Sequence, residues 1–158
     1  MVMHEPNESN DFQADHAWLL LDSYRRLTGR NLLPPGRSAE AMARDPYFAP
    51  FVVLSHDTAA DPVFTYANLT AQRIFAMCWR EIVGLHSRFS AEPMAREERQ
   101  RLLELVASQG YMDDYRGVRI ASTGKRFEIG HATIWNLIGI SGERLGQGAT
   151  FAEWRDLE

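Results

Sequence analysis

The sequence predicts an α+β domain: a five-stranded antiparallel sheet with helices on one face and an N-terminal helix covering the other. Three patterns predict this. Apolar residues at helical spacing open the chain, two short β-branched runs follow, and after further helical segments the apolar period changes from 3.6 to two. Strands that are neighbours in sequence can pair antiparallel, and the helices between them must cover the sheet. A length of 158 residues suits one domain, since domains run about 100–200 residues.

Composition and charge exclude several classes of protein. With 45% hydrophobic and 24% charged residues, the chain can bury a core. A formal net charge of −4 argues against a general nucleic-acid binder, whose domain would be basic. No apolar run approaches the roughly 18 residues of a membrane helix, and no secretory leader is expected. The one cysteine, Cys78, cannot form an internal disulfide, which indicates a cytoplasmic location.

The first third of the chain predicts a leader and two helices. Residues 1–10 lack a periodic apolar pattern and are expected to be a flexible leader, so that residues 11–158 form the single domain. The leading helix is predicted to begin at Asp11 as N-cap and to end at Gly29. A second short helix over residues 38–44 should break at the Asp-Pro of positions 45–46.

Two short strands and a third helix follow. Residues 51–54 and 63–66 are apolar and β-branched, and the polar loop between them allows a hairpin. Asn68 is the expected N-cap of a helix whose apolar spacing continues to Ile82. Cys78 lies on that apolar face, so we interpret it as a buried structural thiol.

The second half predicts a charged helix and three strands. The helix covers residues 94–109, and residues 115–122 and 126–138 form a long hairpin across the turn at 123–125. Residues 145–151 return as the last strand, where the glycines indicate a bulge or a close backbone. Alternation on the second strand of the hairpin places one set on a common face: Phe127, Ile129, His131, Thr133, Trp135 and Leu137.

The chain resembles the MEKHLA domain, a PAS-related family. Residues 63–68 (VFTYAN), followed by Ala71 and Phe75, are similar to the start of a PAS domain, where a strand runs through Ala-Asn into a helix. The fuller resemblance is carried by residues 87–93 (SRFSAEP), 96–99 (REER), 115–120 (YRGVRI), 124–127 (GKRF), 132–137 (ATIWNL) and 146–151 (GQGATF). Residues 19–29 (LLLDSYRRLTG) resemble the leading helix of free-standing bacterial members.

The resemblance implies a PAS-like fold and a sensory or dimer-controlling module. The family also ends plant homeodomain–leucine zipper transcription factors, but this chain has neither a homeodomain nor zipper heptads. The module is therefore implied, and the transcription-factor function is not. His86 stands where the family often has proline, so a ligand role for His86 would be peculiar to this protein.

No motif indicates catalysis or a metal centre. The five histidines show no pair at helical ligand spacing, and no glycine-rich phosphate loop precedes a helix. A PAS-like cavity between sheet and helices would be lined by aromatic and polar candidates: Tyr66, Phe75, Trp79, Arg88, Tyr115, Arg119, Phe127, His131, Trp135 and Asn136. The alternative is that the same aromatic side chains fill an ordinary core. The arginines, among them Arg88, Arg96, Arg99, Arg119 and Arg126, form either an ion-pair lattice or a site for a small anion.

These observations favour a non-enzymatic sensory or interaction module that binds a small ligand or a protein partner and signals through dimerisation. Two alternatives stay open: a small enzyme that uses Arg119, His131 and Asn136, and a ligand-free dimerisation module. The sequence requires no cofactor; a small organic ligand, flavin and haem stay open. A homodimer through the leading helix is expected, because Trp18 and Leu19 add to the apolar coverage that the Leu20-Tyr24-Leu27 stripe already provides.

Overall fold

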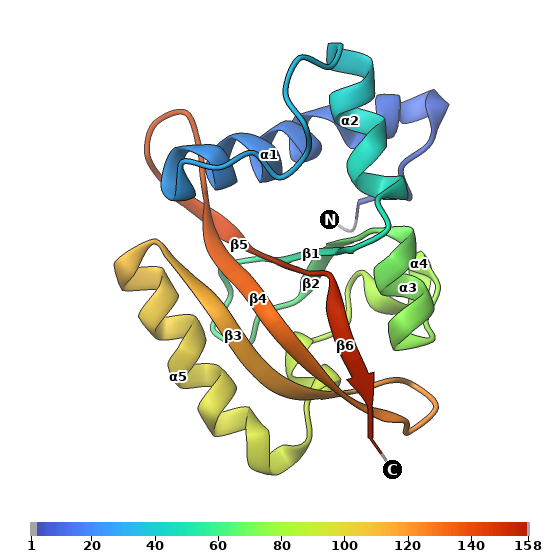
Figure 1. Cartoon of the computed structure of the whole chain (residues 1–158), viewed down its shortest axis with the longest axis vertical. Helices are drawn as coiled ribbons and strands as arrows, with labels where there is room; N and C mark the ends of the chain where they lie inside the picture. Colours follow the sequence, from blue (N-terminus) through green and yellow to red (C-terminus); the bar gives the residue numbers. More distant parts are fainter. Residues whose placement is uncertain (1–2, 158) are drawn as a thin grey trace.

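The computed structural model describes residues 3–157, with the side chains of residues 93–95 left out. Its centre is an antiparallel sheet in the order β2-β1-β5-β4-β3 (Figure 1). The strands are β1 (Val52–His56), β2 (Phe64–Ala67), β3 (Tyr111–Ile120), β4 (Arg126–Ile138) and β5 (Arg144–Phe151). Both predicted hairpins are confirmed, and β3 begins four residues earlier than predicted.

A sixth strand, β6 (Glu153–Asp156), is one that the sequence pattern missed. It pairs with the first half of β4, while β5 pairs with the second half. Only residue 152 separates β5 from β6. The two strands together therefore form a nearly continuous antiparallel partner along the 13-residue strand β4. The sheet is therefore five strands wide, as predicted, and β6 continues the line of its middle strand β5.

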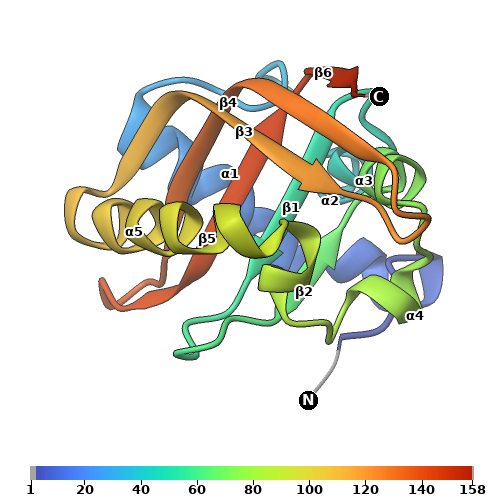
Figure 2. The same cartoon turned by 90° about the horizontal axis from the view of Figure 1, so that it is seen from below.

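Helices cover both faces of the sheet. Helix α1 (Ala14–Thr28) lies across one face with α2 (Ala39–Phe48) beside it, and α5 (Pro93–Gln109) lies on the opposite face (Figure 2). The short helices α3 (Leu69–Phe75) and α4 (Trp79–Ile82) follow β2 at the end of the sheet. Two 3₁₀ helices, η1 (Glu8–Gln13) and η2 (Ser87–Ser90), precede α1 and α5. None of the helices in the described residues is both long and apolar enough to cross a membrane.

The N-terminal segment packs against the domain. The backbone carbonyl of Met3 accepts a hydrogen bond of 2.8 Å from the indole nitrogen of Trp79, and Glu5 bonds to the hydroxyl of Tyr47. Helix α1 begins at Ala14, not at the predicted cap Asp11, because Asp11 and the two residues after it have positive φ angles. Its predicted end is confirmed: Gly29 adopts the left-handed conformation with φ +75°.

Helix α2 shows why the predicted break at residues 45–46 is wrong. Ser38 caps it as predicted, since its hydroxyl accepts from the amide of Ala41 at 3.2 Å. The helix nevertheless continues through Pro46 to Phe48. Proline removes its own amide donor but holds a helical φ, and only two residues of the helix follow it. The carbonyl of Pro46 is still used by Ala49 and Asn68.

The predicted helix of residues 69–82 is two helices, and this corrects the position of the cysteine. Ala76 adopts a left-handed conformation with φ +55°, where its amide closes α3 on the carbonyls of Gln72 and Arg73. Cys78 then becomes the N-cap of α4 and is exposed. The expectation of a buried thiol is therefore wrong, because the helical face that would have buried it ends before it.

A bulge within β4 shows that the predicted common face of this strand is wrong. His131 has a positive φ of 51°, and the pairing of β3 with β4 shifts register beside it. Before this bulge Phe127 packs on Phe75 of α3, with ring centroids 5.2 Å apart. Beyond it Trp135 packs on Tyr24 of α1, on the opposite face, at 5.0 Å. A bulge adds one residue to one strand, so every later side chain changes face.

Candidate functional site

A cavity of about 60 Å³ lies between the sheet and α5. Its apolar wall comes from α5, with Leu102 and Leu103, and from the sheet and α3, with Leu54, Phe64, Phe75, Ile129, Ile134 and Phe151. Its polar lining includes His56, Ser90, Arg99, Tyr115, Arg119 and Gln147. Two to four water molecules would fill a cavity of roughly this size. The site is thus small, and its largely apolar wall carries several hydrogen-bond donors.

Arg99 enters the cavity from α5. It shares a stripe of that helix with Leu102 and Val106, which pack on Ile134 of the sheet, so its side chain is carried inward with only 6% exposed. Its guanidinium donates to the hydroxyl of Ser87. Burial lowers its pKa to about 10, and the positive charge of Arg119 adds to this lowering. Arg99 nevertheless remains charged at neutral pH.

Arg119 reaches the same cavity from β3 and is 8% exposed. One guanidinium nitrogen donates to the carbonyl of Val118 at 2.9 Å, and another donates to the hydroxyl of Tyr115 at 3.2 Å. Within residues 3–157 neither Arg119 nor Arg99 forms an ion pair with a carboxylate. By contrast Arg88 pairs with Asp61 and Arg126 pairs with Glu92. The predicted lattice therefore exists only in part, and it leaves two buried arginines outside it.

Two acceptors at the cavity also lack partners. His56 and Gln147 lie opposite each other in the pairing of β1 with β5. The Nδ1 of His56 lies 2.8 Å from the carbonyl of Asp57 and must donate to it, which leaves Nε2 as an acceptor. Neither this Nε2 nor the Oε1 of Gln147 has a hydrogen-bond partner among the described residues, although both atoms are buried. Burial lowers the pKa of His56 to about 4, so its ring is neutral at pH 7.

Five of the ten predicted site residues lie at or beside this cavity. Phe75, Tyr115 and Arg119 line it directly. Phe127 packs against Phe75, and Asn136 bonds through its Oδ1 to the amide nitrogen of Gln147 at 3.2 Å. Asn136 also donates to the last carbonyls of α5, at 3.0 Å to Val106, which explains how a buried amide is satisfied there.

The other predicted residues lie elsewhere. Tyr66, Trp79 and Trp135 pack with α1, α2 or the N-terminal segment, and Arg88 and His131 lie near the surface. Tyr66 is displaced by a second irregularity, since Thr65 is an extra residue in the pairing of β2 with β1. Phe64 therefore lines the cavity, while Tyr66 stacks on His16 of α1 at 5.5 Å. The predicted positions of Tyr66 and Trp135 are both wrong because of bulges, which a strictly alternating pattern does not contain.

Sequence patterns did hold signals for the residues that the prediction missed. Gln147 shares its alternation on β5 with Ala149 and Phe151, which marks it as a polar side chain on an inward face. Arg99 lies three residues before Leu102 on the apolar stripe of α5. At each of these positions a polar residue stands in an otherwise apolar pattern, and a polar residue on a buried face often indicates a specific role.

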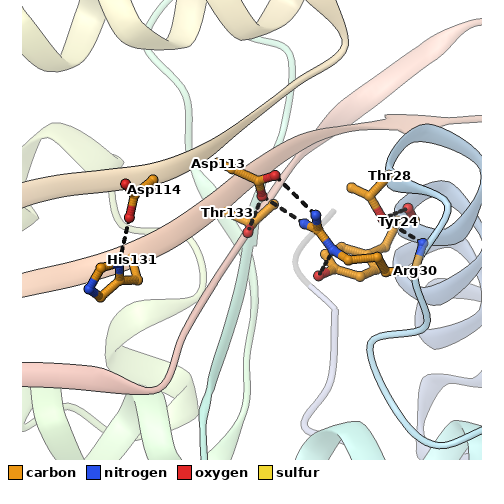
Figure 3. A network of polar contacts seen from close by, with 7 residues as sticks. All are labelled: Tyr24, Thr28, Arg30, Asp113, Asp114, His131 and Thr133. Atoms are coloured by element: carbon orange, nitrogen blue, oxygen red, sulfur yellow. Dashed lines mark hydrogen bonds and ion pairs between the residues drawn. The ribbon is translucent and has the colours of Figure 1, made fainter.

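A separate polar network joins α1 to β3 and β4 (Figure 3). Arg30 donates to both carboxylate oxygens of Asp113, at 2.7 and 3.0 Å, and Thr133 donates to the same carboxylate at 2.8 Å. Beside it, His131 bonds to Asp114 on the exposed side of the bulge. This network ties the segment after α1 to the sheet, and it lies apart from the cavity.

We expect the Arg30–Asp113 pair to give a small stability that disappears in acid. The hydrogen bonds from Arg30 lower the pKa of Asp113. A lowered pKa in the folded state means stability that is present above the unfolded pKa and lost as the pH falls through the folded one. Because both side chains are more than a third exposed, Arg30→Gln should lower the free energy of unfolding at pH 7 by no more than about 1 kcal/mol.

Urea denaturation at pH 7 and at pH values from about 4 downward measures this difference. Arg101→Gln is the matched control, because Arg101 is an exposed arginine outside the network. A deficit of Arg30→Gln that persists at pH 2 would contradict the ion-pair explanation.

Comparison with known proteins confirms the resemblance. No curated protein sequence matches this chain. Among solved structures, the PAS domain of a protein from Colwellia psychrerythraea superposes with a TM-score of 0.61 at 13% identity, covering 73% of this chain and 92% of that one. An RNA-binding light-oxygen-voltage receptor also gives 0.61 at 17% identity, covering 80% of this chain but only 34% of that one. A light-oxygen-voltage domain studied with a flavin analogue gives 0.51 at 17% identity, covering 68% and 78%.

At these identities the superpositions establish the fold alone, which is of the PAS type. The family assignment comes from the sequence. The sequence-family model of the MEKHLA domain matches residues 14–156, from the first residue of α1 to the last residue of β6. The chain belongs to the MEKHLA domain family.

Proposed function

We propose that this chain is a non-enzymatic sensory module of PAS type in the cytoplasm, which binds a small ligand in the cavity under α5 and signals through a homodimer. The observation that carries the proposal is the pair of buried arginines at the cavity without carboxylate partners. A buried charge without a counter-charge destabilises a protein, so a site that keeps two of them is better explained by a ligand than by packing.

The enzyme alternative has less support. It required Arg119, His131 and Asn136 to act together, but Arg119 borders the cavity, His131 is exposed on the bulge and Asn136 is engaged by α5. A flavin, as in the light-oxygen-voltage domain studied with a flavin analogue, does not fit either. The cavity of about 60 Å³ is far below the roughly 300–1,000 Å³ of sites for larger ligands. The ligand that we propose is therefore small.

The proposed dimer surface is an apolar groove beside the N-terminal half of α1. Trp18 is 51% exposed, and Ile140 and Leu145 at the β4–β5 turn are 92% and 47% exposed. All three border one groove, together with Leu19. Exposed apolar patches of this kind mark interaction surfaces, and a twofold dimer is the commonest assembly for a small protein. We therefore propose a second copy of this chain as the occupant of the groove.

The same hairpin connects the two sites. Gln147 borders the ligand cavity, and two residues before it on β5 Leu145 borders the groove. Asn136, which is bonded to Gln147, lies on β4 just before the turn that carries Ile140. A ligand that engages Gln147 would therefore act directly on the hairpin that forms part of the proposed dimer surface.

Native mass spectrometry of freshly purified protein tests both parts of the proposal. We expect a dimer that carries a small additional mass, lost on denaturation. Trp18→Asp should give a monomer that keeps the ligand, whereas Leu105→Asp, at a 39% exposed position on α5, should leave the dimer intact. A wild-type monomer would contradict the dimer, and a protein without added mass that also gains none from a cell extract would contradict the ligand.

A further inference from the structure

The cavity has an excess of donors and positive charge on one side. Among the described residues, Arg99 donates to one side chain, the Ser87 hydroxyl, and Arg119 donates to one carbonyl and one phenol hydroxyl. A guanidinium carries five N–H donors, so both side chains retain unused donors. Asp61, a carboxylate whose charge acts on Arg99, already accepts from Arg88 at 3.1 Å and lies within reach of His86. Asp61 therefore acts on Arg99 only at a distance and forms no ion pair with it.

We propose that Arg99 and Arg119 together bind the carboxylate of a small organic acid in this cavity. The inference rests on the proposed ligand-binding function and names the class of ligand. A planar fork of N–H donors matches the two oxygens of a carboxylate, and an anion between two arginines relieves their mutual repulsion. In a buried site these charge-assisted hydrogen bonds replace the water that the arginines lost.

The size and the lining of the cavity restrict the rest of the molecule. About 60 Å³ admits an acid of only a few non-hydrogen atoms. Leu54, Phe75 and Phe151 offer the remainder of the ligand an apolar surface, which suits a short aliphatic chain and excludes a second charged group.

The two acceptors without partners add a further requirement. The Nε2 of His56 and the Oε1 of Gln147 are buried, and both residues border the cavity. An unsatisfied buried acceptor calls for a donor, and a carboxylate has none to give. A hydroxyl on the ligand would supply one. The site therefore favours a short hydroxycarboxylate over the same acid without the hydroxyl.

Three probes of similar size separate these contributions: lactate, propionate and propionamide. Protein dialysed into a chloride buffer at pH 7.5 is titrated with each at constant ionic strength, and ¹H–¹⁵N chemical shifts and the melting temperature are recorded. We expect propionate to bind and propionamide, which lacks the charge, to give no saturable change. Lactate should bind about 2- to 10-fold more tightly than propionate, which is the range of one neutral hydrogen bond. At ten times its Kd, lactate should raise the melting temperature by about 3–6 °C.

Variants of the arginines test their role. Arg99→Gln and Arg119→Gln should each weaken lactate binding at least 10-fold. The melting temperature of the ligand-free variants should equal or exceed that of the ligand-free wild type, since each loses a buried charge without a counter-charge. Arg101→Gln, an exposed arginine of the same helix, should leave binding unchanged. A structural arginine would behave in the opposite way, with lower stability and unchanged binding, and that result would overturn the proposal.

The wild-type titration decides the matter even where a variant does not fold. Equal binding of propionate and propionamide, or no binding of any acid, overturns the carboxylate assignment. The proposed function still stands in that case when freshly purified protein carries another small molecule or gains one from a cell extract, and it falls with the assignment when the protein does neither.

Discussion

Trp135→Ala is expected to lower the free energy of unfolding by about 3–5 kcal/mol, as truncation of a large aromatic side chain in a core does. The indole is completely buried and meets the ring of Tyr24 edge to face, with centroids 5.0 Å apart. On the neighbouring strand Gly148 leaves room for it, since a Cβ at that position would lie 2.6 Å from the indole. The side chain thus joins α1 to the middle of the sheet, and its loss leaves a cavity between two layers.

Urea denaturation with a constant m-value measures the effect. The indole nitrogen of Trp135 has no hydrogen-bond partner among the described residues, so the loss reports packing alone. Trp135→Phe should therefore cost much less than Trp135→Ala. Ile140→Ala, at a side chain that is 92% exposed, should change stability by less than about 0.5 kcal/mol. A loss below about 1 kcal/mol for Trp135→Ala would show that α1 does not pack on this face.

Asn68→Ala is expected to cost a similar amount, about 3–5 kcal/mol, through lost hydrogen bonds. Asn68 is fully buried at the start of α3. Its Oδ1 accepts from the amides of Val53 and Ala71, at 3.1 and 3.0 Å, and its Nδ2 donates to the carbonyls of Pro46 and Phe51, at 3.1 and 2.7 Å. Alanine would remove the cap of α3 and leave four backbone groups without this partner.

Two further variants isolate the cause. Ser38→Ala removes an exposed N-cap and should cost only about 1 kcal/mol. Asn68→Asp keeps both acceptor bonds but places a carboxylate against two carbonyl oxygens, which raises its pKa in the folded state. Its deficit relative to wild type should therefore shrink as the pH falls, because the protonated acid can donate. A deficit that is independent of pH would contradict this arrangement of donors and acceptors.

Local patterns determined most of the elements. The caps at Ser38 and Asn68, the left-handed glycine at position 29 and the two hairpins were all predictable, because each depends on a few residues that are adjacent in sequence. The motifs of residues 87–151 also indicated the family correctly. These features are local in origin, so the sequence contains them directly.

Which side chains meet in the core depends on long-range packing. Local propensity disfavours the positive φ angles of His131 and Ala76. It also does not indicate that Thr65 is an extra residue in the pairing of β2 with β1. These conformations persist because packing on both sides of the sheet requires them. As a result Trp135 lies on the opposite face from Phe127, and Cys78 is outside the core.

The cavity itself is the clearest case of this division. Arg99, His56 and Gln147 come from α5, β1 and β5, and a polar residue in a local pattern is normally interpreted as solvated. The sequence shows directly that arginines and a polar β5 residue are present within apolar elements. Their burial around one small cavity depends on strand register and helix placement over more than 90 residues, and such long-range geometry is set only when the whole chain packs.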